Sequence, residues 1–512
     1  MPTLENINLG AAANDGTGDN LRAGGQKIND NFTALNGAVG TLAYDENNLL
    51  IDNEAIGASL NKIDLKFGLT DIYLPLWYGV QWDVTNSSPT LTRIGNTAMH
   101  VSLPVQSLMK GCLLLDTGVV NYYLDPTDWS KKADRSASVL AGTDGQVMVE
   151  LPAHYRKFET DGNMRRVKIS PYNLPGFTLV AESYMSAFEA SLQRSNLKLS
   201  SVINTSTDFR GGNNTSAWDA AANSLLGKPV SSISRTLFRT YARNRYAGTK
   251  WNLMVYEAYK TVFWLFTVEY ATMNSQLAVD GTLTVEGYKK GGLGNGVSNA
   301  NSTQWSNFNG QNPFINCGAS NSLANGSGEV SVTVNDFGGA GVNVTFTVPR
   351  YRGIEHPFGH LWKNSDGVNV KIQSAGSGGE SQLWVATNPA DFSDSVYTNY
   401  TNRGLISRTE GYVKTMLLGD FGDILAVTVG GGTTTWWCDY FYTNIPASGE
   451  SLRTLYWGGS ALNGAADGFA YAYSNNTPSN ANANIGSRQC FYFYGQGPCL
   501  LAKDDRYVTG CW

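Results

Sequence analysis

The sequence predicts an α+β fold in which short strands and turns outnumber the helices. The chain of 512 residues contains 56 glycines, and only 15% of its residues are charged, a composition typical of turn-rich proteins with much β-structure. Two segments, 235–245 and 252–274, nevertheless carry clear helix signals. The length allows two to four domains with large cores.

The composition also argues against several functions. With a net charge of −5 and no basic stripe, the chain is not expected to bind nucleic acid. The first residues lack the charged and apolar regions of a signal peptide, and the most apolar run, residues 261–268, is too short to span a bilayer. We therefore expect a protein that is made in a cytoplasm and is not inserted into a membrane.

Residues 1–45 are predicted to form a small helical unit. Its apolar positions fall on one face of a helix and are Leu21, Ile28, Phe32 and Leu35. Asp19 stands where it could cap this helix, and Gly37 where it could end it. An ordinary amphipathic helix is the simplest interpretation of this pattern.

Residues 46–72 are predicted to form a short helical neck. Leu50, Ile56, Leu60 and Ile63 follow one another at mixed spacings that suit burial against partner chains. A helix packed in a core is the alternative. A β-rich connecting region is expected over residues 73–144 and one large domain over 145–512.

Two helices are expected inside the large domain. Ser234 is a good N-cap for the first, which runs through 235–245. The second, within 252–274, has an aromatic stripe that we expect in the core, formed by Tyr256, Tyr259, Phe263, Phe266 and Tyr270.

The region 287–345 is predicted to be a long structured loop insertion. Its first part, 287–330, is rich in Gly, Asn and Ser, and is too aromatic for a linker but too polar for a core. A strand pair follows over 328–349, where valines alternate around a Gly-rich turn.

Residues that could carry chemistry are few. His356 and His360 have a four-residue spacing, but Pro357 and Gly359 would break the helix that a zinc site of this kind needs. The glycine-rich stretches do not fit a Walker A loop, a nucleophile elbow or a dinucleotide fingerprint. We therefore expect no metal, no cofactor and no enzymatic activity.

Six cysteines are spread along the chain without a CxxC pair. Buried free thiols are the default expectation. Cys490, Cys499 and Cys511 could pair if they were oxidised.

The stretch "YWGGSALNGAADGFAYAYSNNTPSNANANIGSRQCF", residues 456–491, mixes large aromatics with many asparagines. Linkers are poor in aromatics, and buried strands are poor in Asn. Tyr and Phe supply rigid contact area while Asn and Ser supply adaptable hydrogen bonds, as in antibody binding surfaces. We expect these side chains to point mostly to solvent on one exposed face.

The segment "DGTGDNLRAGGQKINDNFTALNG" resembles the head motif "GTGDxLRxxxxKINxNFxxL" of many bacteriophage tail and baseplate-attached fibre proteins. The resemblance covers about 25 residues, with Gly24 and Gly25 in place of bulkier residues. It implies that the N-terminus docks onto a phage tail or baseplate protein, and that the chain is a homotrimer.

At the other end, "LRTLYWGGS" followed by "GSRQCF" resembles the end of the formylglycine-generating-enzyme branch of the C-type lectin fold. The segment "GQVMVELPAHY", residues 145–155, resembles the opening strand of that branch. This resemblance implies that residues 145–512 form one C-type lectin-fold domain.

Several segments of the large domain, including "YRGIEHPFGHLWKNSDGVNV" and "PSNANANIGSRQCF", are similar to the variable proteins of diversity-generating retroelements. In that family, adenine-directed mutagenesis randomises a C-terminal stretch on a lectin scaffold. The resemblance implies a variable ligand-binding region over 456–484. Its candidate ligand-binding residues are Tyr456, Ser460, Leu462, Asn463, Asp467, Phe469, Tyr471, Tyr473, Asn475, Asn476, Asn480, Asn482 and Asn484.

Together these resemblances predict a tail-associated receptor-binding protein, synthesised in the host cytoplasm and carried on the virion. Its partner would be a host cell-surface receptor, either a protein or a glycan. The alternative is an oxidase of the formylglycine-generating type. Such enzymes use a closely placed cysteine pair, whereas Cys490 and Cys499 are nine residues apart.

Overall fold

The structure, a computed structural model, describes residues 5–9, 11, 16–40, 74–298, 300–339 and 341–492. The chain divides into two compact units, 1–75 and 76–512. The predicted neck, 46–72, lies outside the described residues, as do Cys499 and Cys511.

The first unit is built around helix α1 (Leu21–Gly40). The preceding segment runs back along it: Asn31 Nδ2 donates to Glu5 O at 2.7 Å, and Lys27 Nζ donates to Asn6 O at 3.3 Å. The predicted helix is confirmed, since α1 contains all four residues of the predicted apolar stripe. Its apolar residues Ile28, Phe32 and Leu35 remain 42%, 67% and 47% exposed, so the described part of this unit leaves the stripe uncovered.

Both ends of α1 differ from the prediction. Asn20 caps the helix, because its Oδ1 accepts from Ala23 N at 2.9 Å. Asp19 instead accepts from Asn8 N at 2.9 Å and pairs with Lys27 Nζ at 2.9 Å, so it ties the preceding segment to the helix. The helix passes through Gly37 and ends at Gly40, since one glycine weakens a helix without having to stop it.

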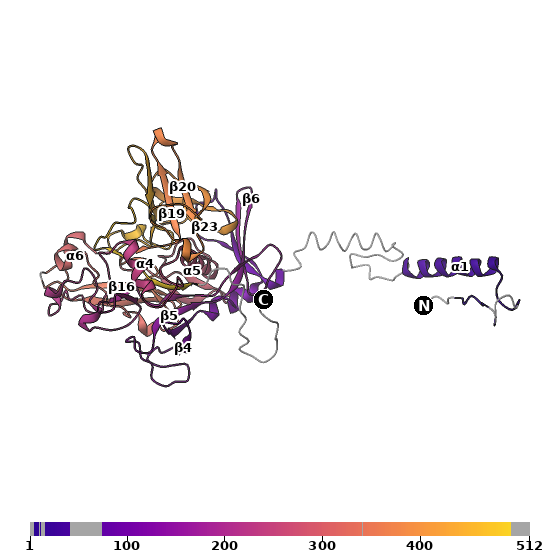
Figure 1. Ribbon diagram of the computed structural model, residues 1–512, viewed down its shortest axis with the longest axis horizontal. Coiled ribbons are helices and arrows are strands. Elements are labelled where there is room, and N and C mark those ends of the chain that lie inside the picture. Colours follow the sequence, from indigo (N-terminus) through magenta and orange to yellow (C-terminus); the bar gives the residue numbers. More distant parts are fainter. Residues whose placement is uncertain are drawn as a thin grey trace. The chain divides into compact units, whose positions relative to one another are not determined.

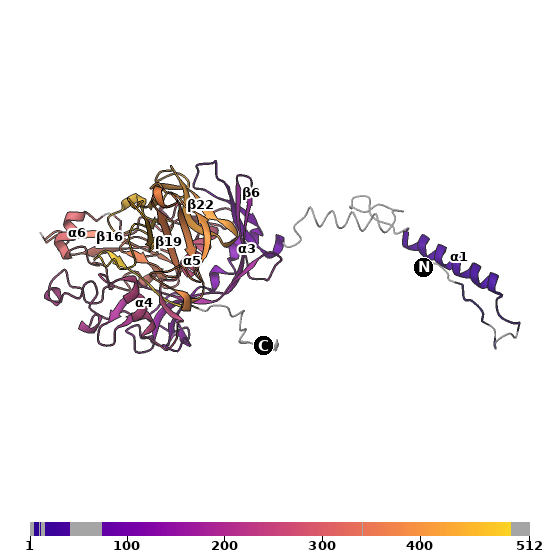
Figure 2. The ribbon, with the colours of Figure 1, turned by 45° about the horizontal axis from the view of Figure 1, so that its top comes forward.

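The second unit mixes helices with many sheets, and its α+β class agrees with the prediction (Figure 1). Its α-helices in the described residues are α3 (Thr97–Ser102), α4 (Arg235–Arg243), α5 (Tyr256–Tyr270) and α6 (Ser302–Asn309). Figures 1 and 2 show α5 in the middle of this unit, surrounded by strands.

Helix α5 forms the centre of the core, as its aromatic stripe predicts. Of its residues only Glu257 is not buried. Trp264 packs on Phe263 with ring centroids 4.8 Å apart, and Trp264 Nε1 donates to Gly422 O at 2.8 Å. Helix α4 begins as predicted at Ser234, whose side chain accepts from Leu237 N. Arg239 of α4 forms an ion pair with Asp366 at 2.6 Å, which fixes this helix against the core.

Two sheets contain both the predicted connecting region and the predicted large domain. The five-stranded sheet has the order β2 (Thr92–Gly95), β1 (Tyr78–Asp83), β7 (Met164–Ser170), β6 (His154–Asp161), β8 (Thr178–Val180). The six-stranded sheet has the order β12 (Trp251–Leu253), β29 (Gln489–Tyr492), β9 (Ser183–Ser186), β5 (Gln146–Leu151), β3 (Lys110–Leu114), β4 (Val120–Tyr123). Residues 73–144 therefore share sheets with the strands that follow residue 145.

The remaining sheets hold the rest of the unit. The seven-stranded sheet has the order β23 (Asp423–Val429), β22 (Gly411–Leu418), β24 (Tyr440–Tyr442), β27 (Ala472–Tyr473), β26 (Tyr456–Trp457), β18 (Trp362–Asn364), β28 (Ile485–Gly486). The four-stranded sheet has the order β21 (Thr401–Leu405), β20 (Ser381–Val385), β19 (Val368–Gln373), β25 (Glu450–Arg453). Smaller sheets pair β10 (Ser191–Gln193) with β11 (Lys198–Ser200) and β13 (Val279–Leu283) with β14 (Lys289–Gly291).

The predicted loop insertion, 287–345, has a core of its own. It contains α6 and the predicted hairpin of β15 (Gly328–Val334) and β16 (Val344–Tyr351), to which β17 (Ile354–Glu355) adds a third strand. Trp305, Phe314 and Phe346 are buried together there. The polar composition hid this small core, because its apolar residues are widely spaced and some of them, such as Leu361 and Ala461, come from outside the region. In both views α6 lies at one end of the unit and β6 at the other (Figures 1 and 2).

Candidate functional site

Strand alternation sorts the aromatic residues of the seven-stranded sheet onto two sides. Successive side chains of a strand point to opposite faces, so Tyr440 and Tyr442 share one face of β24 while Phe441 faces the core. In β26, Trp457 stacks on Tyr256 of α5, with centroids 5.6 Å apart, and Tyr456 therefore faces the other way. The sheet thus turns a set of tyrosines away from α5.

We call this set the aromatic face. Its members are Trp362, Tyr412, Tyr440, Tyr442, Tyr456, Tyr471 and Tyr473. Tyr473 lies directly opposite both Tyr442 and Tyr456 in the strand register. The Tyr473 ring is stacked on that of Tyr442 at 4.8 Å and 10°, and on that of Tyr456 at 5.8 Å and 16°.

The remaining contacts extend the face to both sides. Trp362 packs edge-on against Tyr471 at 4.7 Å. Tyr440 packs against Tyr471 at 6.0 Å and against Tyr412 at 5.2 Å. Cross-strand aromatic pairs of this kind each contribute roughly 0.2–1 kcal/mol to a sheet.

The members of the aromatic face lie at two depths. Tyr412, Tyr440, Tyr442 and Tyr473 are half-buried. Trp362, Tyr456 and Tyr471 are buried and support them. Burial raises the pKa of Tyr456 and Tyr471, so both remain neutral phenols at neutral pH.

The residues predicted to bind ligand lie at three depths. Asn482 is exposed. The half-buried ones are Leu462, Asn463, Tyr473, Asn475, Asn476, Asn480 and Asn484. The buried ones are Tyr456, Ser460, Asp467, Phe469 and Tyr471. The expectation that these side chains mostly point to solvent on one exposed face is therefore wrong for the buried group.

Phe469 is the clearest of these corrections. Its ring lies 5.0 Å from Phe266 of α5 and 5.8 Å from Phe358, and its carbonyl accepts from Tyr259 Oη at 2.7 Å. The chain enters the core here because the preceding residue is Gly468, with φ +149°, whose missing Cβ leaves room for the Asp439 carboxylate. Composition alone could not separate this aromatic from those of the sheet surface.

Asp467 and Asp439 form a buried acidic group beneath the segment. Among the described residues neither carboxylate oxygen of Asp467 has a hydrogen-bond partner, and the carboxylate of Asp439 accepts only from Ala470 N, at 2.7 Å. Burial raises the pKa of both carboxyls well above the ordinary value, although the charge of Lys363 opposes the rise at Asp467. Gly459, with φ +73°, is required because any Cβ there would collide with Asp467 Oδ1.

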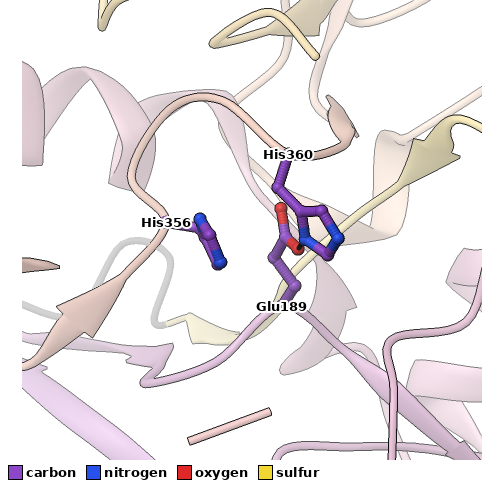
Figure 3. Close-up of side chains that lie close together, drawn as sticks. All are labelled: Glu189, His356 and His360. Atoms are coloured by element: carbon purple, nitrogen blue, oxygen red, sulfur yellow. Dashed lines mark hydrogen bonds and ion pairs between the residues drawn. The ribbon is translucent and has the colours of Figure 1, made fainter. Parts of the chain in front are cut away.

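A second buried polar cluster joins residues that are far apart in the sequence. His356 and His360 lie in the turn between β17 and β18, and Glu189 comes from the segment after β9 (Figure 3). The histidine ring centroids are 4.8 Å apart, and both residues have positive φ, 46° and 56°. The helix-breaking residues between them do preclude a helix, but the turn still brings the two rings together. Only the fold could reveal Glu189 as their neighbour.

The hydrogen bonds of this cluster do not favour a metal ion. His360 Nδ1 lies 2.6 Å from Glu189 Oε2, and His360 Nε2 accepts from Phe314 N at 3.2 Å. Lys363 Nζ lies 3.0 Å from Glu189 Oε1, so a cation would have to displace an ammonium group. Burial lowers the pKa of His356 well below 6.5, which keeps this ring neutral. Glu189, Lys363 and His360 thus form a buried polar network beside the turn before β18, whereas neither ring nitrogen of His356 has a hydrogen-bond partner among the described residues.

The described cysteines give little support to an oxidase that uses a reactive cysteine. Among the described residues, Cys112, Cys317, Cys438 and Cys490 are buried and form no disulfide with one another. Burial raises the pKa of Cys490 to about 12, so its thiol stays protonated at neutral pH and is a poor nucleophile.

A cavity of about 470 Å³ lies at another place in the second unit, lined by residues that include Asp116, Lys198 and Arg245. Its charged groups are paired with one another, since Asp116 lies 3.1 Å from Lys198 Nζ and 2.7 Å from Arg245 Nη1. The residues that line this cavity belong neither to the aromatic face nor to the segment 456–484.

Comparison with known proteins finds a family match for the N-terminal residues. The family model "Bacteriophage T4 gp9/10-like protein, N-terminal" matches residues 4–90, a range that includes α1 and β1. No curated protein matches the chain. None of the helices in the described ranges is long and apolar enough to cross a membrane. The match at residues 4–90 indicates a phage tail structural or attachment protein, and hence a component of the virion that associates with other tail proteins.

Proposed function

We propose that this chain is a host-recognition protein of a phage tail. The first unit attaches it to a tail or baseplate protein, and the aromatic face of the second unit binds a ligand on the host surface. The observation that carries the proposal is the half-buried tyrosine set on one side of the seven-stranded sheet, in a chain whose N-terminus matches a tail protein family. Rigid, partly exposed tyrosines flanked by asparagines are typical of recognition surfaces.

Attachment is supported by the uncovered stripe of α1. Phe32 is 67% exposed and Leu35 is 47% exposed, an apolar row that would be covered by a tail protein or by other copies of the chain. We propose a homotrimer held through residues 1–72. Light scattering should then give a smaller assembly for residues 73–512 than for the whole chain. An unchanged stoichiometry would assign oligomerisation to the second unit.

Diversification by a retroelement is the second part of the proposal. The resemblance of the C-terminal segments supports it, together with a C-type lectin fold for residues 145–512. Asn475, Asn476, Asn480 and Asn482 are positions at which substitution would change the surface without disturbing the core, because all are half-buried or exposed. The DNA around the gene tests this. It should contain a near-copy of the 3′ end that differs only at adenines, beside a reverse transcriptase gene.

Host binding is tested with the whole chain on cells of a strain that the phage infects. Tyr440→Ala and Tyr442→Ala should weaken cell binding at least tenfold, because each removes a half-buried ring of the aromatic face. Tyr172→Ala is the matched control, since Tyr172 is 52% exposed and lies outside the seven-stranded sheet. Equal binding by all three variants would refute the assignment of this face.

A further inference from the structure

The aromatic face carries no formal charge. Its members are tyrosines and one tryptophan, and the half-buried side chains beside it include the amides of Asn463 and Asn475. The nearby guanidinium of Arg453 donates from Nη1 to Asn475 O at 2.6 Å, which ties it to the chain. Glu410 lies beside Tyr440 and Arg453 beside Tyr473, so the surroundings of the face carry charges of opposite sign and favour neither an anion nor a cation. The charge pattern therefore favours a neutral ligand.

The exposed area is too small for a protein partner by itself. Each half-buried tyrosine leaves at most about a third of the 150–250 Å² of an aromatic side chain open, so the four together offer at most roughly 200–350 Å². A stable protein interface buries about 800 Å² on each partner. One or two sugar rings are of the size that this face can cover.

The hydrogen-bonding groups also suit a sugar. The hydroxyls of Tyr412, Tyr440 and Tyr442 make no hydrogen bond to another described residue, so each can donate to a ligand and accept from it. The Tyr473 and Tyr471 hydroxyls receive only long contacts, from Asn475 Nδ2 at 3.4 Å and Asn463 Nδ2 at 3.5 Å. A pyranose ring offers hydroxyls to such groups and C–H bonds to the rings.

The face is also preorganised. Tyr442, Tyr473 and Tyr456 form one stack of nearly parallel rings, and the buried members beneath them prevent large movements. Little side-chain freedom remains to be lost when a ligand binds, which favours affinity from a small contact.

We propose that the aromatic face binds a neutral saccharide of the host cell surface, and that Tyr412, Tyr440 and Tyr442 are contact residues. This inference rests on the proposed host-recognition function. These three tyrosines lie outside 456–484, so they supply a constant platform for the sugar. The half-buried asparagines of 456–484 then adjust which sugar is accepted.

The experiment compares binding of the whole chain to intact host cells, to proteinase-treated cells and to cells oxidised with periodate, which cleaves vicinal diols of sugars. We expect binding to survive proteinase, to fall at least tenfold after periodate, and to be competed by neutral polysaccharide purified from the same cells. Tyr442→Ala should lower binding at least tenfold. Tyr442→Phe, which keeps the ring and loses the hydroxyl, should lower it less, and melting temperatures check that both variants fold.

The outcomes separate the two proposals. If binding survives periodate and is lost after proteinase, the ligand is a protein; the saccharide assignment then fails and the host-recognition function stands. If binding is periodate-sensitive but unchanged in Tyr440→Ala and Tyr442→Ala, the sugar binds elsewhere and the assignment of this face is wrong. If the wild-type chain binds no cells of a permissive strain, both proposals fail.

Discussion

Replacement of Phe469 by alanine should destabilise the second unit far more than replacement of Tyr473, although both lie in the segment predicted to be variable. Phe469 is 2% exposed and contacts Phe266, Phe358 and Tyr259. Removal of a buried phenylalanine costs about 3–5 kcal/mol, because the transfer free energy is lost and a cavity remains.

The expected cost at Tyr473 follows from its contacts on the sheet surface. Its ring is half-buried and forms cross-strand pairs with Tyr442 and Tyr456. At roughly 0.2–1 kcal/mol for each pair, Tyr473→Ala should lower the free energy of unfolding by about 0.5–2 kcal/mol. The free energies of unfolding of the two variants should therefore differ by roughly 1–4.5 kcal/mol.

Urea unfolding of the whole chain, followed by tryptophan fluorescence, measures this difference. Asn482→Ala is the control for an exposed position and should change the unfolding midpoint little. Equal losses in Phe469→Ala and Tyr473→Ala, or a loss below about 1 kcal/mol in Phe469→Ala, would refute the depth assignment.

Three further predictions concern two buried ionisable side chains and one helix cap. Burial raises the pKa of Asp467, so the folded chain holds the proton of this carboxyl more tightly than the unfolded chain does. The stability of the folded chain should therefore fall as the pH rises above about 4. Asp467→Asn should raise the melting temperature more at pH 7 than at pH 4. Arg488→Ala should cost several kcal/mol in urea unfolding, because the buried guanidinium donates to the carbonyls of Ser186, Glu355 and His356. Ser234→Ala should cost about 1 kcal/mol in the same assay, and Ser234→Gly less, as expected for an N-cap.

The elements with strong local signals could be predicted from the sequence. The Ser234 cap and the aromatic stripe of α5 located both central helices, and alternating valines located the β15–β16 hairpin. These signals are local, since they depend on residues within one or two turns or on directly paired strands. The start of α1 was less well predicted, because Asp19 and Asn20 are both good caps. Only the structure shows that the Asn20 side chain accepts the capping hydrogen bond.

The buried polar clusters could not be predicted. Glu189 and His360 are 171 residues apart and meet only because the turn before β18 packs against the segment after β9. Asp439 and Asp467 come together in the same way, and nothing in their neighbours along the chain marks them as buried. Long-range contacts of this kind are a property of topology rather than of local pattern.

The aromatic face could have been found from the sequence by its period of two. In "YFY" at 440–442 and "YAY" at 471–473 the tyrosines alternate with a core residue, which places all of them on one side of their strands. The segment 456–484 was instead interpreted by composition, which cannot separate the two sides. Because each strand alternates, a change at Tyr456 alters the outer side while a change at Trp457 removes a ring that stacks on α5. Tolerance to substitution in β26 and β27 should therefore follow the alternation of the strands and not the type of residue.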